Sequence, residues 1–434
     1  MRKQIVTFFV FIALFTMSNY AQQWTYEGAF PPPPDTLKTN TGVQFVTVDP
    51  DGKVWIAPFR TFVDSVFVPD SGKYKVVRPL YVYNPDGTPW DTIRAVTIGS
   101  VFYPLYNSKY GLDKDQNGNI LTCDFDNLFR INYQTGEGMN VVVPQFNQAI
   151  CSPAVSDNGD IYIAQVFPGY PLRIFNSDFT FRENVVDTLE NFGRYTEVSA
   201  DGNTVYAARF GAKKVIVYSR PDEFSPWEVD SVLIGAVVES GTWDPVNGNI
   251  WFSSGSYFDP PLNGLTPSMW YSFNPETWAV QDSVGWVFLN APTLTDSANQ
   301  RPRGIAFSND GTDMYVACFG ASNFPPVQRF NNPAHTVGVR PDPNVVVTDY
   351  TLAQNYPNPF NPTTDIKFTV AKEGFVTLKV YDLLGKEVTT LVDQQMPSGG
   401  YTADFDASNL ASGTYIYTLS VNGVSISKKM MLLK

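Results

Sequence analysis

A short pattern that occurs six times in the middle of the chain constrains the fold more than any other feature of the sequence. Each copy has an apolar residue, then Asp or Ser, a short polar stretch, a glycine, and an apolar or aromatic run that a small residue closes. The glycines recur at intervals of about 40 to 65 residues, and one four-stranded propeller blade takes about 40 to 50. The copies span residues 48–57, 112–123, 155–164, 198–208, 243–253 and 307–317.

The glycine and the polar residue before it predict tight hairpins, because glycine adopts positive φ and Asp or Ser bonds back to the turn. Consecutive positions after each glycine are apolar, so both faces of that strand must be covered, as they are between stacked blades. We therefore predict an all-β fold with a six-bladed β-propeller over residues 22–330, in which residues 23–27 add a closing strand. Seven blades are the alternative, because residues 53–110 and 249–302 leave room for another unit.

Charge and composition exclude several classes of function. A net charge of −12 repels polyphosphate, so we expect no nucleic acid partner. The single histidine, His335, excludes a multi-histidine metal site, and we expect it in a solvated loop. Cys123, Cys151 and Cys318 are too few and too scattered for a disulfide framework, so we expect three small buried residues.

The N-terminus has the pattern of a secretory signal. Arg2 and Lys3 precede an apolar run at residues 5–15, and the small residues Ser18 and Ala21 follow. The run is too short to span a bilayer. We predict that residues 1–21 are a signal peptide.

The sequence changes character towards its C-terminal end. Short segments at 365–370, 375–381, 387–392, 401–405, 414–421 and 424–433 are separated by glycine-containing turns. They predict a small antiparallel β-sandwich over residues 349–434. Residues 331–348, which contain several prolines, are the expected linker between the two domains.

This C-terminal region resembles the type A C-terminal sorting domain of cargo proteins of the type IX secretion system. The residues that carry the resemblance are Pro357, Asn358, Pro359, Gly385, Gly413, Lys429 and Lys434. The resemblance implies export across both membranes, recognition by the type IX translocon, and removal by a sortase within the linker. It also implies an extracellular or cell-surface location, by release or by attachment to surface lipopolysaccharide.

The central repeats resemble secreted propellers of the NHL-like and lactonase-like group. Streptogramin lyases, which are similar in copies such as FVTVDPDGKVWIA, use histidines inside the propeller, whereas His335 follows the last repeat. Gluconolactonases bind a metal through Glu and Asn residues, and that pattern does not map onto the six copies. The resemblance therefore implies the fold and neither activity.

One stretch of the second repeat has the spacing of a calcium loop. Asp113, Asp115 and Asn117 alternate around the turn, and Asp124 follows at a distance that suits a closing carboxylate. The alternative is an ordinary polar hairpin, one residue longer than its neighbours. Calcium is the only cofactor that the sequence suggests.

We assign no catalytic residue from the sequence alone. Glu197 and Glu239 precede repeat strands, and burial in a central channel would raise their pKa values for acid and base chemistry. We expect a binding or interaction protein with an unknown glycan, peptide or protein ligand. A secreted hydrolase or lactonase with a carboxylate site in the propeller mouth is the alternative, and a structural envelope component is a third interpretation.

Overall fold

The computed structural model describes most of the chain after residue 23. The described residues are 24–32, 42–59, 64–107, 109–142, 149–255, 265–287, 301–320, 326–333, 335, 339–342, 347–372, 374–396, 398–407 and 410–434. The expected signal peptide lies outside them. In this part of the chain, no helix is long and apolar enough to cross a membrane.

Six four-stranded antiparallel sheets account for most of the described residues from 24 to 331. Sheet 1 contains β2 (Val43–Val48), β3 (Val54–Pro58), β6 (Leu80–Tyr83) and β7 (Pro89–Ile93). Sheet 2 contains β10 (Lys109–Lys114), β11 (Ile120–Asp124), β12 (Asn127–Ile131) and β13 (Gly138–Val142). Sheet 3 contains β14 (Ala154–Val155), β15 (Ile161–Ile163), β16 (Leu172–Phe175) and β17 (Phe181–Val186).

The other three sheets follow in chain order. Sheet 4 contains β18 (Phe192–Val198), β19 (Thr204–Phe210), β20 (Lys214–Ser219) and β21 (Glu228–Val232). Sheet 5 contains β22 (Gly241–Trp243), β23 (Ile250–Ser253), β24 (Met269–Phe273) and β25 (Val280–Gly285). Sheet 6 contains β26 (Arg301–Phe307), β27 (Asp313–Phe319), β28 (Val327–Asn331) and β1 (Thr25–Ala29).

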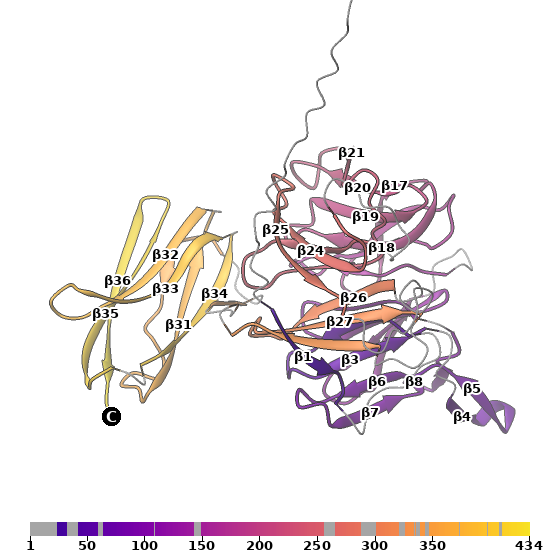
Figure 1. The fold of residues 1–434 in the computed structure, drawn as a ribbon, viewed down its shortest axis with the longest axis horizontal. Coiled ribbons are helices and arrows are strands. Elements are labelled where there is room, and N and C mark those ends of the chain that lie inside the picture. The colour runs from indigo at the N-terminus through magenta and orange to yellow at the C-terminus, as the bar shows by residue number, and fades with distance from the viewer. Residues whose placement is uncertain are drawn as a thin grey trace, which may run out of the picture.

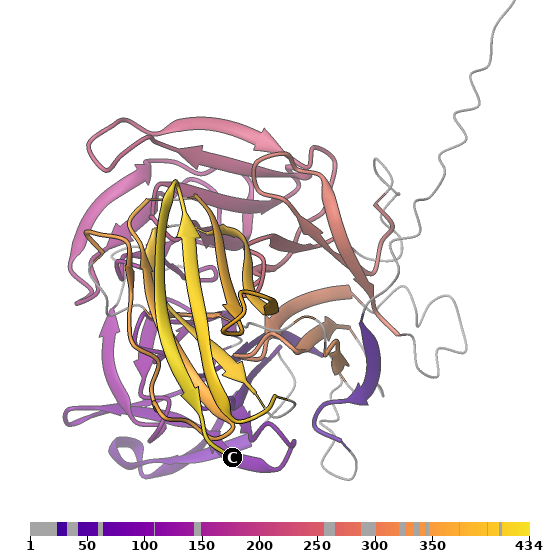
Figure 2. The same cartoon turned by 90° about the vertical axis from the view of Figure 1, so that its left-hand side faces the viewer.

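The sheets form a propeller-like ring, as the repeat predicted (Figures 1 and 2). The first strands of successive sheets contact one another, and β2 of sheet 1 contacts β26 of sheet 6. The predicted closing strand is confirmed: β1, from the start of the described chain, pairs antiparallel with β28. The long segment between β3 and β10 also holds η1 (Pro69–Ser71) and two hairpins, formed by β4 (Asp64–Val68) with β5 (Lys73–Val77) and β8 (Ala95–Ile98) with β9 (Val101–Pro104).

The repeated glycines build six similar tight turns. The backbone N–H of the Asp or Ser bonds to the carbonyl four residues later in the first three turns and five residues later in the last three. Each glycine donates its backbone N–H to the carbonyl of the repeat's Asp or Ser at 2.8 to 3.1 Å, with φ between +70° and +87°. In sheets 1 and 5 this Asp also accepts an indole N–H, from Trp55 to Asp49 at 2.8 Å and from Trp251 to Asp244 at 3.0 Å. We call the end of the ring that carries these turns the turn side, and the opposite end the loop side.

The strands that follow the turns are buried on both faces, as predicted. In β3, β11 and β23 every residue is buried, and all three cysteines are buried and free. Transferring these apolar side chains out of water supplies most of the driving force for packing sheet against sheet.

The described residues after 338 form a separate β-sandwich with its own core (Figure 1). One sheet contains β29 (Val339–Asp342), β34 (Gly399–Asp406), β31 (Thr363–Val370) and β30 (Thr351–Leu352). The other contains β33 (Glu387–Met396), β32 (Gly374–Tyr381), β35 (Gly413–Val421) and β36 (Val424–Leu432). The predicted sandwich is therefore present. Strand β29 falls within the expected linker and pairs with β34 at the sheet edge.

The prediction that His335 is solvated is wrong. Its side chain is 9% exposed, its Nε2 lies 2.9 Å from Asp244 Oδ2, and its Nδ1 lies 2.8 Å from the Gly311 carbonyl oxygen. Its ring also packs against Trp24 and Phe307. Sequence distance hid these partners, because Asp244 precedes His335 by 91 residues.

Candidate functional site

A cavity of about 180 Å³ lies on the axis of the ring. Five of the six first strands, β2, β10, β18, β22 and β26, contribute lining residues, and Ser152 contributes from just before β14. Because every sheet faces the axis with its first strand, the repeat architecture itself brings residues that are far apart in sequence into one space. The cavity is thus the site that the fold positions most directly.

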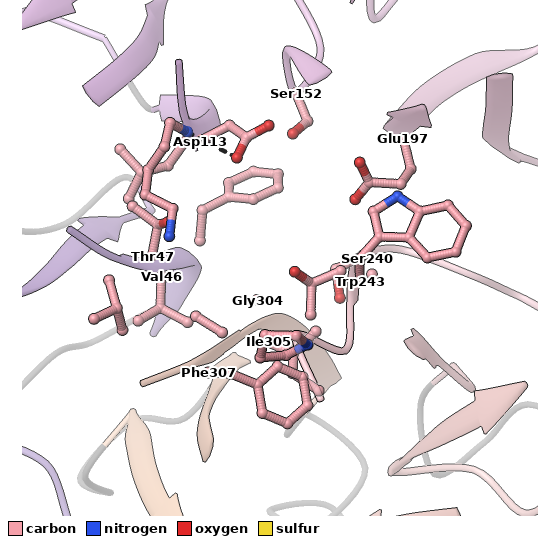
Figure 3. Close-up of a pocket in the computed structure, with 18 of the residues that line it drawn as sticks. Val46, Thr47, Asp113, Ser152, Glu197, Ser240, Trp243, Gly304, Ile305 and Phe307 are labelled. Carbon is pink, nitrogen blue, oxygen red and sulfur yellow. Dashed lines mark hydrogen bonds between the residues drawn. The ribbon is translucent and has the colours of Figure 1, made fainter. Parts of the chain in front are cut away.

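Asp113 and Glu197 are the two acidic residues in the cavity wall. Figure 3 shows their carboxyl groups entering the cavity from different sides, with Ser152 between them. Asp113 Oδ1 accepts the Lys114 backbone N–H at 2.7 Å. Glu197 Oε1 accepts the Val198 backbone N–H at 3.1 Å, and its Oε2 accepts the Tyr195 hydroxyl.

Both carboxyl groups hold protons more tightly than usual. Burial raises the pKa of Asp113 to about 7, against the backbone hydrogen bond and the positive charge of Lys114, and the negative charge of Asp115 adds to the rise. Burial raises the pKa of Glu197 to about 8, and the charge of Asp113 adds to the effect, against the hydrogen bonds from Tyr195 and Val198. Near neutral pH the cavity therefore holds at least one neutral carboxyl group, which can both donate and accept a hydrogen bond.

Asp113 and Glu197 occupy the same column of the repeat. Each lies two positions before the Asp or Ser that begins its turn, where the other copies have Thr47, Ala154, Thr242 and Ala306. Four of the six residues in this column are polar, and all four line the cavity. The sequence interpretation missed Asp113 as a cavity residue because it took Asp113 as the start of the second turn.

The structure places that second turn two residues later. The Gly118 backbone N–H donates to the Asp115 carbonyl at 2.8 Å, and the Asp115 backbone N–H donates to the Asn119 carbonyl at 2.8 Å. The spacing from Asp115 to Gly118 equals that in the turns at Gly52, Gly159, Gly202 and Gly311, and the closing pair is no longer than in any of them, so the expectation of a longer hairpin is wrong.

The four calcium candidates have separate partners. Asp115 pairs with Arg130 at 2.9 Å and accepts the Asn117 backbone N–H at 2.9 Å. Asp124 pairs with the buried Lys109 at 2.6 Å, at the other end of the β10–β11 hairpin, and Asp113 faces the cavity. Within the described residues, no group of three or more His, Cys, Asp or Glu side chains is arranged to hold a metal ion.

Glu239 does not line the cavity with Glu197. It pairs with Arg194 at 2.9 Å and with Arg303 at 3.4 Å, and it is 5% exposed. The sequence analysis grouped the two glutamates because each precedes a repeat strand. Their positions in the sequence do not reveal that Glu239 alone has arginine partners.

The sorting candidates lie on the surface of the sandwich. Pro357, Asn358 and Pro359 are exposed, and Asn358 Oδ1 accepts the Met431 backbone N–H at 2.9 Å across a separation of 73 residues. Next to them, Phe360 is buried and bridges Leu432. The start of the predicted sorting signal therefore lies against the last strand of the chain.

The remaining sorting candidates lie at strand ends or on the last strand. Gly385 has φ of +80° in the turn between β32 and β33, and Gly413 opens β35 opposite Leu432. Lys429 on β36 and the terminal Lys434 are both exposed. All seven candidates thus belong to one small domain.

Comparison with known families agrees with this placement. Residues 354–433 match the family described as secretion system C-terminal sorting domain. The match supports the resemblance to type IX cargo and indicates export by the type IX secretion system to the cell surface or beyond. No curated protein matches the sequence.

Solved structures with a similar fold are distant in sequence. A protein of unknown function from Bacteroides caccae is 12% identical over 55% of this chain and 78% of its own, with a TM-score of 0.38. A chain of the mitotic checkpoint complex is 11% identical over 71% of this chain and 95% of its own, with a TM-score of 0.43. The resemblance to NHL-like or lactonase-like propellers stays a prediction.

Proposed function

We propose that this protein is type IX cargo whose propeller binds a small polar ligand in the axial cavity. The observation that carries the proposal is the pair of carboxyl groups at one repeat position of the cavity wall, the buried Glu197 and the half-buried Asp113. Among the described residues, neither has an ion-pair partner. A buried acid such as Glu197 that lacks an opposite charge costs folding stability, and such perturbed groups concentrate at functional sites.

The ligand chemistry follows from the cavity wall. A neutral carboxyl group, the Ser152 and Ser240 hydroxyls, and Thr47 and Thr242 offer both donors and acceptors. Trp243 and Phe307 supply apolar surface beside them. This mixture suits a ligand rich in hydroxyl or amide groups, such as part of a glycan or a peptide.

Array screening followed by calorimetry tests the binding function. The purified protein is screened against glycans and peptides, and each ligand is titrated into Glu197→Gln and Asp113→Asn. Glu276→Gln, in an exposed turn, is the control. We expect the cavity variants to lose affinity and the control to keep it; a ligand bound equally by all three contradicts the proposal.

A carboxylate-dependent hydrolase is the second candidate, and the two raised pKa values favour it. A group that is protonated near neutrality serves as a general acid, and a neighbouring group that releases its proton more easily serves as a base. Lactone and glycoside substrates test this function. Turnover that Glu197→Gln abolishes supports the hydrolase, and turnover that survives this change excludes the cavity as its site.

Processing of the chain is a further part of the proposal. Exposure of Pro357, Asn358 and Pro359 supports recognition by the translocon, and sortase removal of the sandwich with optional lipopolysaccharide attachment follows from the resemblance. The mass of the mature protein from the medium and from the cell surface tests both processing sites. A mature protein that retains the sandwich contradicts sortase removal.

A further inference from the structure

The axial cavity reaches the turn side of the ring. Lys114 and Val48 end their strands there, and Pro245 and Asn309 lie beyond the strand ends, yet all four line the cavity. On the loop side the lining ends at Phe45 on β2, in the middle of β10, β18 and β26, and at Ser152 and Ser240 just before β14 and β22. A ligand that enters along the axis from the turn side therefore passes the turns of the sheets before it reaches the cavity.

The chain leaves the propeller on this same side. His335 is held by Asp244 and by the carbonyl of Gly311, which belong to the turns of sheets 5 and 6. Strand β29 begins at Val339, four residues later. Four residues span at most about 14 Å, so the edge of the sandwich lies close to these turns.

A second link between the two domains involves the opposite side of the ring. Burial raises the pKa of Tyr401 on β34, and the negative charge of Asp157 adds to this shift. Asp157 lies in the turn of sheet 3, between Ser156 and Gly159. Because the six sheets follow one another in order around the axis, sheet 3 lies opposite sheet 6. The charge of Asp157, an exposed residue of this turn, thus acts on the sandwich from the side of the ring opposite sheet 6.

We propose that the sorting domain covers the turn-side mouth of the propeller and controls access to the axial cavity. Viewed towards the sandwich, the domain lies in front of the ring (Figure 2). The export domain then keeps the ligand site closed while it is attached, and its displacement opens the site. The biological purpose rests on the proposed binding function, whereas the covering itself can be measured without a ligand.

Thiol labelling of the full chain measures the covering. The three native cysteines are buried, so one engineered cysteine reports on its own position. Lys114→Cys places the thiol in the mouth. Within the described residues the lysine side chain makes no hydrogen bond or ion pair, and only the more distant charges of Asp113 and Asp49 act on it. Val229→Cys on the outer strand β21, where the native side chain is 68% exposed, is the matched control. The reagent is a polymer-linked maleimide, whose bulk makes its reaction sensitive to a domain in front of the mouth.

A longer tether tests the cause of any protection. A flexible Gly/Ser insertion of about twenty residues between Thr336 and Val337 adds an average reach of roughly 25 Å. The same insertion between Leu383 and Leu384, in an exposed turn of the sandwich, controls for the insertion itself. Circular dichroism and thermal melting verify that each variant is folded.

The proposal predicts a clear order of rates. Lys114→Cys reacts at least about tenfold more slowly than Val229→Cys, as expected for a site that reacts only after local opening. The tether insertion brings the two rates together, and the control insertion does not. Equal rates in the original chain, or protection that the long tether leaves unchanged, overturn the proposal. Because no ligand is involved, these results stand apart from success or failure of the binding screen.

Discussion

Glu197 lies on β18 of sheet 4 and Glu239 lies just before β22 of sheet 5, and both are buried, but their surroundings differ. Glu239 pairs with two arginines, Arg194 and Arg303. Glu197 receives only neutral donors, from Tyr195 and Val198, and its pKa rises to about 8. The comparison teaches that burial alone does not mark a functional acid. Glu239 forms ion pairs that hold neighbouring strands together, whereas Glu197 has no cationic partner and keeps its proton to a higher pH.

The largest expected difference concerns stability. Glu239→Gln leaves Arg303, which is 8% exposed, without its carboxylate, and breaking a buried ion pair typically costs about 3 to 5 kcal/mol. Glu197→Gln replaces a mostly neutral acid by a neutral amide at pH 7, so we expect a change below about 1 kcal/mol. Urea unfolding at pH 7 compares the two variants. Equal losses of stability would remove the distinction between the two glutamates.

The pH dependence of the unfolding free energy should differ between Glu197→Gln and the original protein. The folded pKa of Glu197, about 8, lies above the ordinary value of 4.5, so its contribution is complete below pH 4.5 and is lost as the pH rises through 8. Glu197→Gln removes this loss. We expect the difference in unfolding free energy between Glu197→Gln and the original protein to grow from pH 5 to pH 9, in favour of the variant. A difference that does not change with pH contradicts a raised pKa.

His335 is a largely buried base that has an acidic partner, Asp244. Burial lowers its pKa, but the hydrogen bond and the charge of Asp244 outweigh this, so the net shift is upward from 6.5. The pair therefore stabilises the fold fully below pH 6.5 and less as the pH rises through the folded pKa. We expect His335→Gln to cost about 1 to 3 kcal/mol at pH 6 and less at pH 9, measured by denaturant unfolding. A larger cost at pH 9 than at pH 6 would show that the charged pair contributes nothing.

The smallest expected effect is electrostatic coupling within the cavity. Asp113→Asn removes a negative charge that raises the pKa of Glu197. Carbon-13 NMR of the glutamate carboxyl groups, with Glu197→Gln for assignment, should show a lower Glu197 pKa in Asp113→Asn. An unchanged pKa would mean that the two groups do not interact.

Much of the architecture could be predicted because the repeat is a local signal. Gly52 and its five counterparts mark turns that backbone geometry requires, and the apolar pairs after them mark strands buried on both faces. The C-terminal motifs predicted a compact sandwich for the same reason. The closing strand β1 followed from the need to complete sheet 6.

The site was harder to predict because its residues meet only through the closed ring. A two-residue error in aligning the second copy hid the fact that Asp113 and Glu197 share one column. The partners of Glu239 and His335 come from other sheets, so local sequence does not reveal them. Strand β29 was read as linker because its partner β34 follows about sixty residues later.

The most direct test of the account is the protonation state of Glu197 at neutral pH. Infrared difference spectra between the original protein and Glu197→Gln, recorded at pH 7 with carbon-13 labelled glutamate, report it without any ligand. The account predicts the carbonyl band of a neutral carboxylic acid that disappears in the variant and titrates near pH 8. Only carboxylate bands, with titration in the ordinary range of glutamate, would contradict it.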